Sequence, residues 1–181
     1  MKQPRFVTLL VTGTPGTGKT TLAKKLSLLL DYAYFDVGLF VKKAHLYSSY
    51  DRKRRTYVVD EAKLARQLIK VREEALKSAS SASKTAKKGI IFDSHMSHYL
   101  PSKYSDLCIV TSCSLKILEQ RLRRKGYGQA KVRENLDAEI FDTCLAEAQE
   151  NGHKVLKFDT TAAKNSDAKA LAGRINKLVR T

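Results

Sequence analysis

With 181 residues, the chain is long enough to bury a core in one compact domain and too short for two domains of ordinary size. Hydrophobic residues make up 43% and charged residues 29% of it, and no apolar run approaches the roughly 20 residues of a membrane-spanning helix, so we expect neither a disordered nor a membrane-spanning protein. The 34 basic and 18 acidic side chains give a formal net charge of +16, which favours polyanions and phosphate groups as partners.

The first predicted elements are a short strand and a helix joined by a glycine-rich loop. Residues 6–12 are apolar and β-branched, which is typical of a buried strand, and residues 20–30 are rich in Ala, Leu and Lys, which is typical of a helix. Between them, GTPGTGKT at residues 13–20 matches the pattern G-x-x-x-x-G-K-[ST] in full. This pattern predicts a phosphate-binding P-loop, because glycines let the backbone amides curl around a phosphate.

The loop residues have expected roles in binding ATP and Mg²⁺. The Lys19 side chain is expected to contact the β- and γ-phosphates, and the Thr20 hydroxyl to ligate Mg²⁺. Thr21, in the first helical turn, is placed to contact the α-phosphate. The predicted nucleotide-binding residues of this loop are Gly13, Gly16, Gly18, Lys19, Thr20 and Thr21.

The middle of the chain predicts one further strand, two helices and a loop. Residues 32–36 predict the strand, and apolar side chains at helical spacing predict helices over residues 37–47 and 60–76. The stretch SASSASKTAKK at residues 78–88 is small, polar and repetitive, which predicts a flexible surface loop.

Basic side chains are grouped along the chain rather than spread evenly. Residues 42–72 hold ten Lys or Arg against three acids, including the run of four at residues 52–55, and residues 116–133 hold seven against one. Residues 134–150 hold six acids and no base. This segregation favours contact with nucleic acid or an acidic partner. The alternative is that these segments are solvated faces that aid solubility.

Alternating strands and helices complete the sequence. Residues 89–93 and 107–111 are apolar runs that are typical of central parallel strands covered on both faces. The remaining elements are expected as a helix ending at residue 125, helices at residues 136–150 and 167–179, and a strand at residues 155–158. Strands that alternate with helices predict a three-layer α/β domain with a mainly parallel sheet, spanning residues 1–181 as a single domain.

The cysteines and the N-terminal sequence indicate an intracellular protein. Cys108, Cys113 and Cys144 are odd in number and form no CxxC pair, so we expect buried, reduced thiols rather than disulfides or a zinc site. The first apolar run passes directly into the glycine-rich loop, which differs from the pattern of a secretory signal.

Asp93 and His95 follow a predicted strand, near the expected phosphate site. A carboxylate at the carboxyl end of an apolar strand is the usual Walker-B group that holds Mg²⁺ or its water, so Asp93 is a predicted catalytic and metal-binding residue. The alternative for Asp93 is a turn or a helix cap. His95 is a predicted catalytic residue that orients a water or contacts the phosphates, and the alternative is that it only hydrogen bonds the loop backbone.

Phosphoryl transfer also requires cations, because alignment and charge neutralisation contribute most of the catalysis. Arg121 and the basic residues 123–125 end a predicted helix just before the glycine-flanked turn at residues 126–128. We interpret this region as a short lid over ATP, with Arg121 as a catalytic residue and Lys125 as an ATP-binding residue. The alternative is an exposed basic helix end, which the helix dipole favours.

Several short motifs occur in the order seen in one protein family. They are GTPGTGKTTL at residues 13–22, VG at 37–38, LYxxYD at 46–51, DE at 60–61, DxH at 93–95, GY at 126–127, and EN with EIF within 134–141. On these motifs, over residues 6–147, the chain resembles the small nuclear adenylate-kinase-like NTPases, the adenylate kinase isoenzyme six type also described as coilin-interacting nuclear ATPases. Only the P-loop among them is shared widely with other NTPases.

The resemblance implies a P-loop NTPase of the nucleoside monophosphate kinase type, with a five-stranded parallel sheet, an acceptor-binding segment at residues 36–59 and a lid at residues 124–134. It implies conversion of ATP and AMP to two ADP, ATPase activity, and a role in small ribosomal subunit maturation in the nucleus and cytoplasm. The implied partners are AMP or another nucleoside monophosphate, a small-subunit ribosomal protein and the rRNA precursor. Asp93 and His95 match the family's DxH motif, and Lys164 matches a lysine near the adenine of relatives.

Three departures from the family affect the acceptor segment and the lid. Leu39 stands where the family usually has Asp, residues 52–55 replace a stretch that is commonly acidic, and Lys125 replaces an arginine before GY. These changes leave the acceptor preference open and make the rim of the acceptor segment better suited to RNA. Two alternatives to a kinase of this family are a nucleotide-gated ribosome assembly ATPase with little net kinase activity, and a small-metabolite kinase of the same fold.

Overall fold

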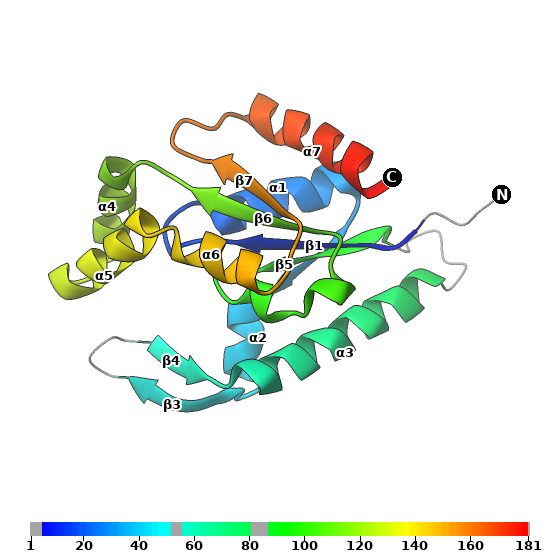
Figure 1. Ribbon diagram of the computed structural model, residues 1–181, viewed down its shortest axis with the longest axis horizontal. Helices are drawn as coiled ribbons and strands as arrows, with labels where there is room; N and C mark the ends of the chain where they lie inside the picture. The colour runs from blue at the N-terminus through cyan, green and yellow to red at the C-terminus, as the bar shows by residue number, and fades with distance from the viewer. Residues whose placement is uncertain (1–4, 52–55, 81–86, 181) are drawn as a thin grey trace.

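A five-stranded parallel sheet forms the centre of the molecule (Figure 1). The computed structural model describes residues 5–51, 56–80 and 87–180. The strands of this sheet lie in the order β2 (Ala33–Asp36), β5 (Gly89–Asp93), β1 (Val7–Thr12), β6 (Leu107–Ser112) and β7 (Val155–Asp159). Every pairing within it is parallel, so the five-stranded parallel α/β fold predicted from the sequence is confirmed.

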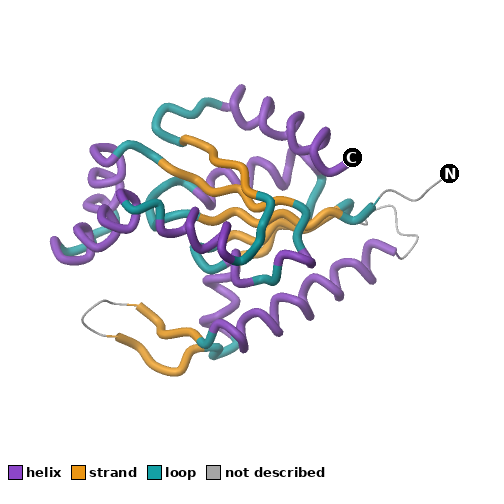
Figure 2. The backbone as a smooth tube through the Cα atoms, in the orientation of Figure 1, coloured by secondary structure: helices purple, strands orange, loops and turns teal. Residues whose placement is uncertain are grey.

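Helices cover both faces of the sheet and give the molecule three layers (Figure 2). α1 and α7 pack on one face, whereas α2, α3 and α6 pack on the other. The helices are α1 (Lys19–Leu30), α2 (Val37–Lys43), α3 (Glu61–Ser80), α4 (Leu115–Arg124), α5 (Gln129–Ile140), α6 (Thr143–Glu150) and α7 (Asn165–Arg180), with the short 3-10 helices η1 (Ser97–Tyr99) and η2 (Ser102–Tyr104). This double cover explains why β1 and β5 are buried along their whole length and have apolar sequences.

Side chains of β1 alternate between two hydrophobic cores. Leu9 and Val11 pack with α1 and α7, whereas Leu10 packs with α2 and α3 on the opposite face. Full burial of a side chain such as Leu9 or Leu10 contributes about 1.5–3 kcal/mol. β1 is therefore held firmly between the two cores, and the loop after it is anchored to a rigid strand.

A two-stranded antiparallel hairpin, β3 (Tyr47–Asp51) with β4 (Thr56–Val59), lies beside α2 and was not predicted from the sequence (Figure 1). Tyr50 pairs directly with Tyr57 across the hairpin, and their ring centroids are 5.0 Å apart. The ring of Tyr47 lies 4.4 Å from that of Tyr57. Such aromatic pairs stabilise the sheet. The basic run at residues 52–55 lies outside the described residues.

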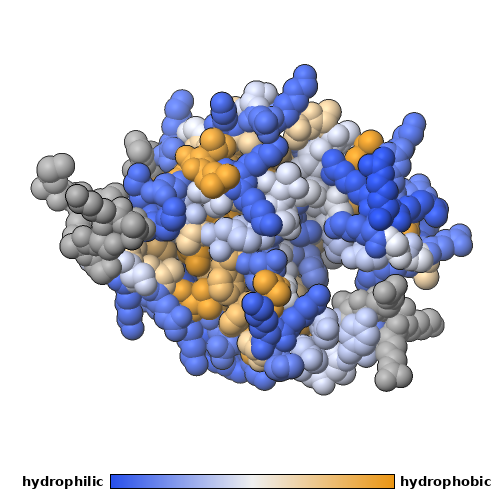
Figure 3. All heavy atoms as spheres, turned by 180° about the vertical axis from the view of Figure 1, so that it is seen from behind, coloured by the Kyte–Doolittle hydropathy of each residue, from blue (hydrophilic) through white to orange (hydrophobic). Residues whose placement is uncertain are grey.

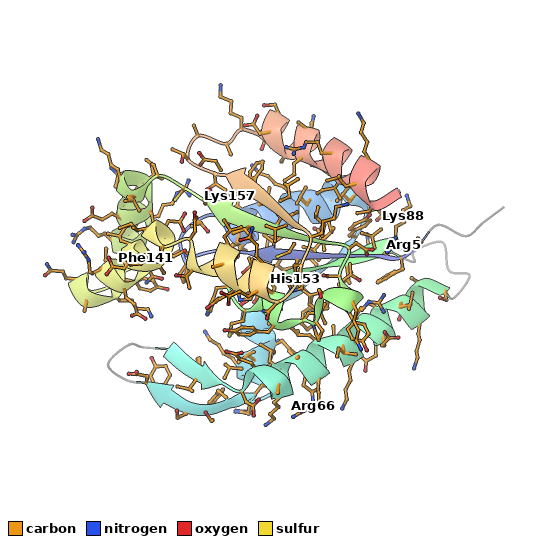
Figure 4. All side chains as sticks on the ribbon, viewed as in Figure 1. Arg5, Arg66, Lys88, Phe141, His153 and Lys157 are labelled. Carbon is orange, nitrogen blue, oxygen red and sulfur yellow. The ribbon has the colours of Figure 1, made fainter. Side chains whose placement is uncertain are left out.

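The single helix predicted over residues 136–150 is wrong, because the chain forms α5 and α6 with a corner between them. Asp142 has a φ of 48°, in the left-handed region, where a right-handed helix cannot continue. Its carboxylate accepts hydrogen bonds from Lys157 Nζ of β7 at 2.8 and 2.9 Å, which hold the corner to the sheet. Phe141, at the same corner, is 76% exposed (Figure 4).

α3 is longer than predicted and runs to Ser80, although the sequence predicted a loop from residue 78. The Ser80 hydroxyl donates to the Leu76 carbonyl at 3.0 Å, a local bond that small polar residues can make within a helix. Residues 81–86 of the predicted loop lie outside the described residues. Charged side chains recur along α3, and within the described ranges no helix is both long and apolar enough to cross a membrane.

Candidate functional site

The phosphate-binding loop links β1 to α1 at the carboxyl edge of the sheet, in the strand, loop and helix order expected of its motif. Its φ angles are 136° at Gly13, 96° at Gly16 and 91° at Gly18. Glycine adopts these left-handed angles without strain, so the backbone can curl tightly. α1 begins directly after the loop, at Lys19, and its N-terminus adds positive potential where phosphates would bind.

Threonine side chains fix this loop to the neighbouring strands. The Thr17 hydroxyl donates to the Thr14 carbonyl at 2.8 Å and lies 2.7 Å from the Thr111 hydroxyl of β6. Thr160, just after β7, donates to the Thr17 carbonyl at 2.6 Å. These bonds hold the loop in one shape, and preorganised donors are what stabilises charge during catalysis. Thr160 was not predicted, because nothing in the sequence links a threonine after the last strand to the loop.

Lys19 is buried beneath the loop. Its Nζ donates to the Thr14 carbonyl at 2.9 Å, which folds the side chain back over the loop. Burial lowers the pKa of Lys19 to about 8, the charge of Lys125 acts in the same direction, and Cys144 and Asp93 oppose the shift. The ammonium group is therefore charged at neutral pH but poorly solvated, so a phosphate would be a favourable partner for it.

The affinity for ATP should fall as the pH rises through about 8, the pKa of Lys19. Below this pH the protonated amine attracts phosphate, and above it the neutral amine does not. Since each pH unit above a pKa lowers the protonated fraction tenfold, the dissociation constant of ATP should rise about tenfold between pH 7 and pH 9.

Calorimetric titration with ATP at the two pH values measures this change. Lys19→Arg is the control, because its guanidinium stays charged at both pH values and should remove the pH dependence. Equal affinities of the parent protein at pH 7 and pH 9 would contradict the assignment.

Asp93 ends β5, directly beside β1, and is 3% exposed. Its Oδ2 accepts a hydrogen bond from the Tyr34 hydroxyl at 2.8 Å, whereas Oδ1 is buried and has no hydrogen-bond partner in the described part of the chain. The Thr20 side chain is within hydrogen-bonding reach of the Tyr34 hydroxyl, so Thr20 lies close to the same carboxylate. A buried carboxylate oxygen without a partner, next to a hydroxyl, fits the oxygen ligands that Mg²⁺ prefers. Asp93 and Thr20 are the residues that would hold this ion, which when bound neutralises phosphate charge.

His95 lies two residues after Asp93, and part of the residue is exposed to solvent. Desolvation by the protein packed around its ring lowers the pKa of His95 to about 4, and the charges of Lys19, His98 and Lys131 act in the same direction. The ring is therefore neutral at physiological pH. A neutral imidazole can orient a water molecule by hydrogen bonding, but it adds no positive charge to the phosphates.

A cavity of about 420 Å³ opens beside the phosphate-binding loop, within the range of small-molecule sites. Of the residues that the structure describes, six basic side chains and no acidic one line it: Lys19, Lys25, Arg121, Arg124, Lys125 and Lys164. The predicted residues Gly16, Gly18, Thr20 and Thr21 line the same cavity, whereas Gly13, Asp93 and His95 do not. This concentration of positive charge suits a triphosphate, because charged groups bind phosphate oxygens through strong hydrogen bonds.

Arg121 connects α4 to the phosphate-binding loop and to the segment after β7. Its Nη1 donates to the Gly16 carbonyl at 3.4 Å and to the Thr160 hydroxyl at 3.1 Å, and its Nη2 donates to the Thr160 carbonyl at 3.1 Å. These bonds brace the cavity wall, and a guanidinium has five N–H donors, so others remain for phosphate. Lys125 caps the end of α4 on the same wall.

Tyr34 and Lys25 belong to the site but were not predicted. Tyr34 lies in the predicted strand at residues 32–36, and its contact with Asp93 depends on β2 pairing with β5, which the sequence does not reveal. Lys25 lies in α1 and lines the cavity, but a single lysine in an amphipathic helix carries no signal of its own.

The predicted acceptor segment, residues 36–59, contains α2 and the β3–β4 hairpin. It lies across a hollow from the part of the molecule that carries α4 and α5 (Figure 3). Asp36 caps α2 by accepting a hydrogen bond from the Leu39 backbone N–H at 2.8 Å, and the Leu39 side chain is 49% exposed. An apolar side chain at this position offers no hydrogen bond to an acceptor.

Comparisons with known proteins place the chain among adenylate-kinase-like proteins. The family model described as an AAA domain matches residues 9–142. An adenylate kinase isoenzyme 6 homolog of Schizosaccharomyces pombe is 35% identical over 143 residues, which are 79% of this chain and 74% of that protein. One of Dictyostelium discoideum is 32% identical over 162 residues, 88% of this chain and 85% of that protein. The solved structure of a sugar kinase from Janibacter sp. HTCC2649 has a TM-score of 0.60 at 13% identity, covers 96% of this chain and 95% of its own, and shows the fold alone.

Proposed function

This chain belongs to the family of adenylate kinase isoenzyme 6 homologues, and from that premise we propose that it transfers a phosphoryl group from ATP to AMP, giving two ADP. In this reaction an oxygen of the AMP phosphate attacks the γ-phosphorus of ATP while the bond to the bridging oxygen of ADP breaks. Alignment and charge neutralisation carry most of such a transfer. The protein's task is therefore to hold the two nucleotides in line and to surround the phosphates with positive charge.

The observation that carries the proposal is the meeting of three features at one edge of the sheet. The buried ammonium of Lys19, the buried Oδ1 of Asp93 and a cavity lined by basic side chains all lie around the phosphate-binding loop. Lys19 would stabilise charge that develops between the β- and γ-phosphates, and Arg121 and Lys125 would close the cavity wall around them. Lys164, on the same wall, would lie near the adenine.

ATP hydrolysis is the second part of the proposed activity. It follows when water replaces AMP as the acceptor, and the neutral ring of His95 would orient such a water by hydrogen bonding. The exposed Leu39 favours this outcome, because the acceptor segment offers no carboxylate at that position. A nucleotide-gated assembly ATPase with little net kinase activity is accordingly the second candidate function.

The cellular role that we propose is maturation of the small ribosomal subunit in the nucleus and cytoplasm. Its proposed partners are a small-subunit ribosomal protein and the rRNA precursor. The formal net charge of +16 supports a polyanionic partner, because one nucleotide does not require so large an excess of cations.

The test is ATP turnover with Mg²⁺, followed by separation of the nucleotides, with and without each nucleoside monophosphate. We expect two ADP for each AMP consumed and little free phosphate. ADP with equimolar free phosphate, unaffected by any monophosphate, would instead make water the acceptor and support the assembly ATPase. Absence of turnover under every condition would contradict both candidates.

A further inference from the structure

The hydroxyl of Tyr34 interacts with both residues that would hold Mg²⁺. It donates to Asp93 Oδ2 at 2.8 Å, and it also lies within hydrogen-bonding reach of the Thr20 side chain. We propose that Tyr34 is a positioning residue that holds one oxygen of Asp93 so that the other is presented to the metal ion or to its water. This proposal rests on the proposed function, since it assigns a further residue to the same phosphoryl-transfer site.

The sheet register and the strand alternation place Tyr34 for this role. β2 pairs with β5 in parallel, with Tyr34 opposite Ile91, so the long phenol reaches along the edge to Asp93. Phe35, the next residue, packs on the other face of the sheet against Phe92, with ring centroids 5.4 Å apart. Neighbouring residues of a strand point to opposite faces. Tyr34 therefore faces the side covered by α1, the helix that carries Thr20.

α1 also fixes the Tyr34 ring. The ring packs against the hydrophobic core shared by α1 and α7, and Lys24 Nζ of α1 lies 5.4 Å from its centroid. A cation at this distance from an aromatic face is attracted to it. The hydroxyl is thus held on a rigid ring rather than on a mobile surface side chain.

The hydroxyl is a donor throughout the working pH range. Burial, the hydrogen bond to Asp93, and the charges of Asp93 and Asp36 all raise the pKa of Tyr34 far above its usual value, and Thr20 opposes the shift only in part. A neutral donor occupies one carboxylate oxygen and leaves the other available as a ligand. Asp93 Oδ1 then remains buried and without a hydrogen-bond partner in the described residues, and a cation would supply that missing partner.

Tyr34→Phe removes the donor and keeps the ring, so it isolates the positioning effect. Loss of a group that orients a metal ligand usually weakens metal affinity about 10- to 100-fold. We expect the Mg²⁺ concentration that gives half-maximal turnover to rise about tenfold, with turnover at saturating Mg²⁺ little changed. The affinity for ATP in the absence of metal should stay the same.

A direct readout that needs no turnover is Mn²⁺ binding to the protein with a non-hydrolysable ATP analogue, measured by electron paramagnetic resonance. Tyr34→Phe should weaken it by the same factor. Tyr99→Phe is the matched control, because it removes another tyrosine hydroxyl bonded to a carboxylate, that of Glu61, and should leave Mn²⁺ binding unchanged. A protein that binds Mn²⁺ with the analogue but transfers no phosphoryl group would contradict the proposed function while leaving the role of Tyr34 measurable.

A double variant that combines Tyr34→Phe with Asp93→Asn tests whether Tyr34 acts through Asp93. In an Asp93→Asn background, Tyr34→Phe should have no further effect on Mn²⁺ affinity, because the carboxylate that it positions is gone. Unchanged Mn²⁺ affinity in the single variant would overturn the proposal. A loss of the same size in both backgrounds would overturn it as well, since Tyr34 would then act independently of Asp93.

Discussion

Replacement of Lys19 by methionine should lower phosphoryl transfer and ATP hydrolysis together, by about 10³-fold. The reason is geometric as well as electrostatic. Lys19 Nζ is buried at the base of the phosphate-binding loop, 2.9 Å from the Thr14 carbonyl, so its charge is held at a fixed point next to where the β- and γ-phosphates would bind. Charge stabilisation by a fixed group in a partly desolvated site contributes more than the same group would in water.

Steady-state assays of both activities with saturating ATP and Mg²⁺ measure this loss. The fold should remain intact, because methionine fills a similar volume and removes a charge whose burial is unfavourable, as the lowered pKa of Lys19 indicates. Lys169→Met is the matched control, since Lys169 is an exposed residue of α7 outside the cavity, and its activity should equal that of the parent. A Lys19→Met protein that retains a tenth or more of either activity would contradict the role given to this residue.

The central strands and the phosphate-binding loop were predictable because local sequence determines them. An apolar run covered on both faces, such as residues 89–93, has few alternatives to a central parallel strand. The loop motif specifies a backbone shape that only glycines at fixed positions allow. In both cases the signal lies within a few consecutive residues.

The hairpin and the helix corner were not predictable for the opposite reason. The β3 segment Tyr47–Asp51 contains two exposed serines, and its pairing depends on the tyrosine that β4 contributes from across the hairpin. The corner between α5 and α6 falls at Asp142, with neither Gly nor Pro to mark it, and depends on Lys157 of β7. Tertiary contacts determine both features.

The residues of the candidate site also fall into two groups, those that local sequence identifies and those that only tertiary contacts reveal. Lys19 and Thr20 were identified by a motif and Asp93 by its place after a strand. Tyr34 and Thr160 act through contacts with residues that are 59 and 143 positions away in the chain, at Asp93 and Thr17 respectively. Such contacts appear only when the strand order is known.

Replacement of Gly13 by alanine should be the most destabilising single change in the phosphate-binding loop. A Cβ at this position would lie 2.4 Å from the Thr111 carbonyl oxygen and 2.6 Å from the Thr111 hydroxyl, and the φ of 136° is one that side chains rarely adopt. The backbone of β6 cannot move away, because β6 is paired with both β1 and β7. Backbone strain and overpacking together should cost about 2–5 kcal/mol.

Thermal unfolding measures the effect, and the Tm should fall by about 5–15 °C. Gly173→Ala is the matched control: Gly173 lies in α7, has nothing within 4 Å of its added Cβ, and should become slightly more stable because alanine favours a helix. ATP affinity should fall in Gly13→Ala as well, since relief of the clash shifts the loop that holds Lys19. Equal Tm values for the two alanine variants would mean that the loop adjusts without strain, and that the close contact with Thr111 does not fix its shape.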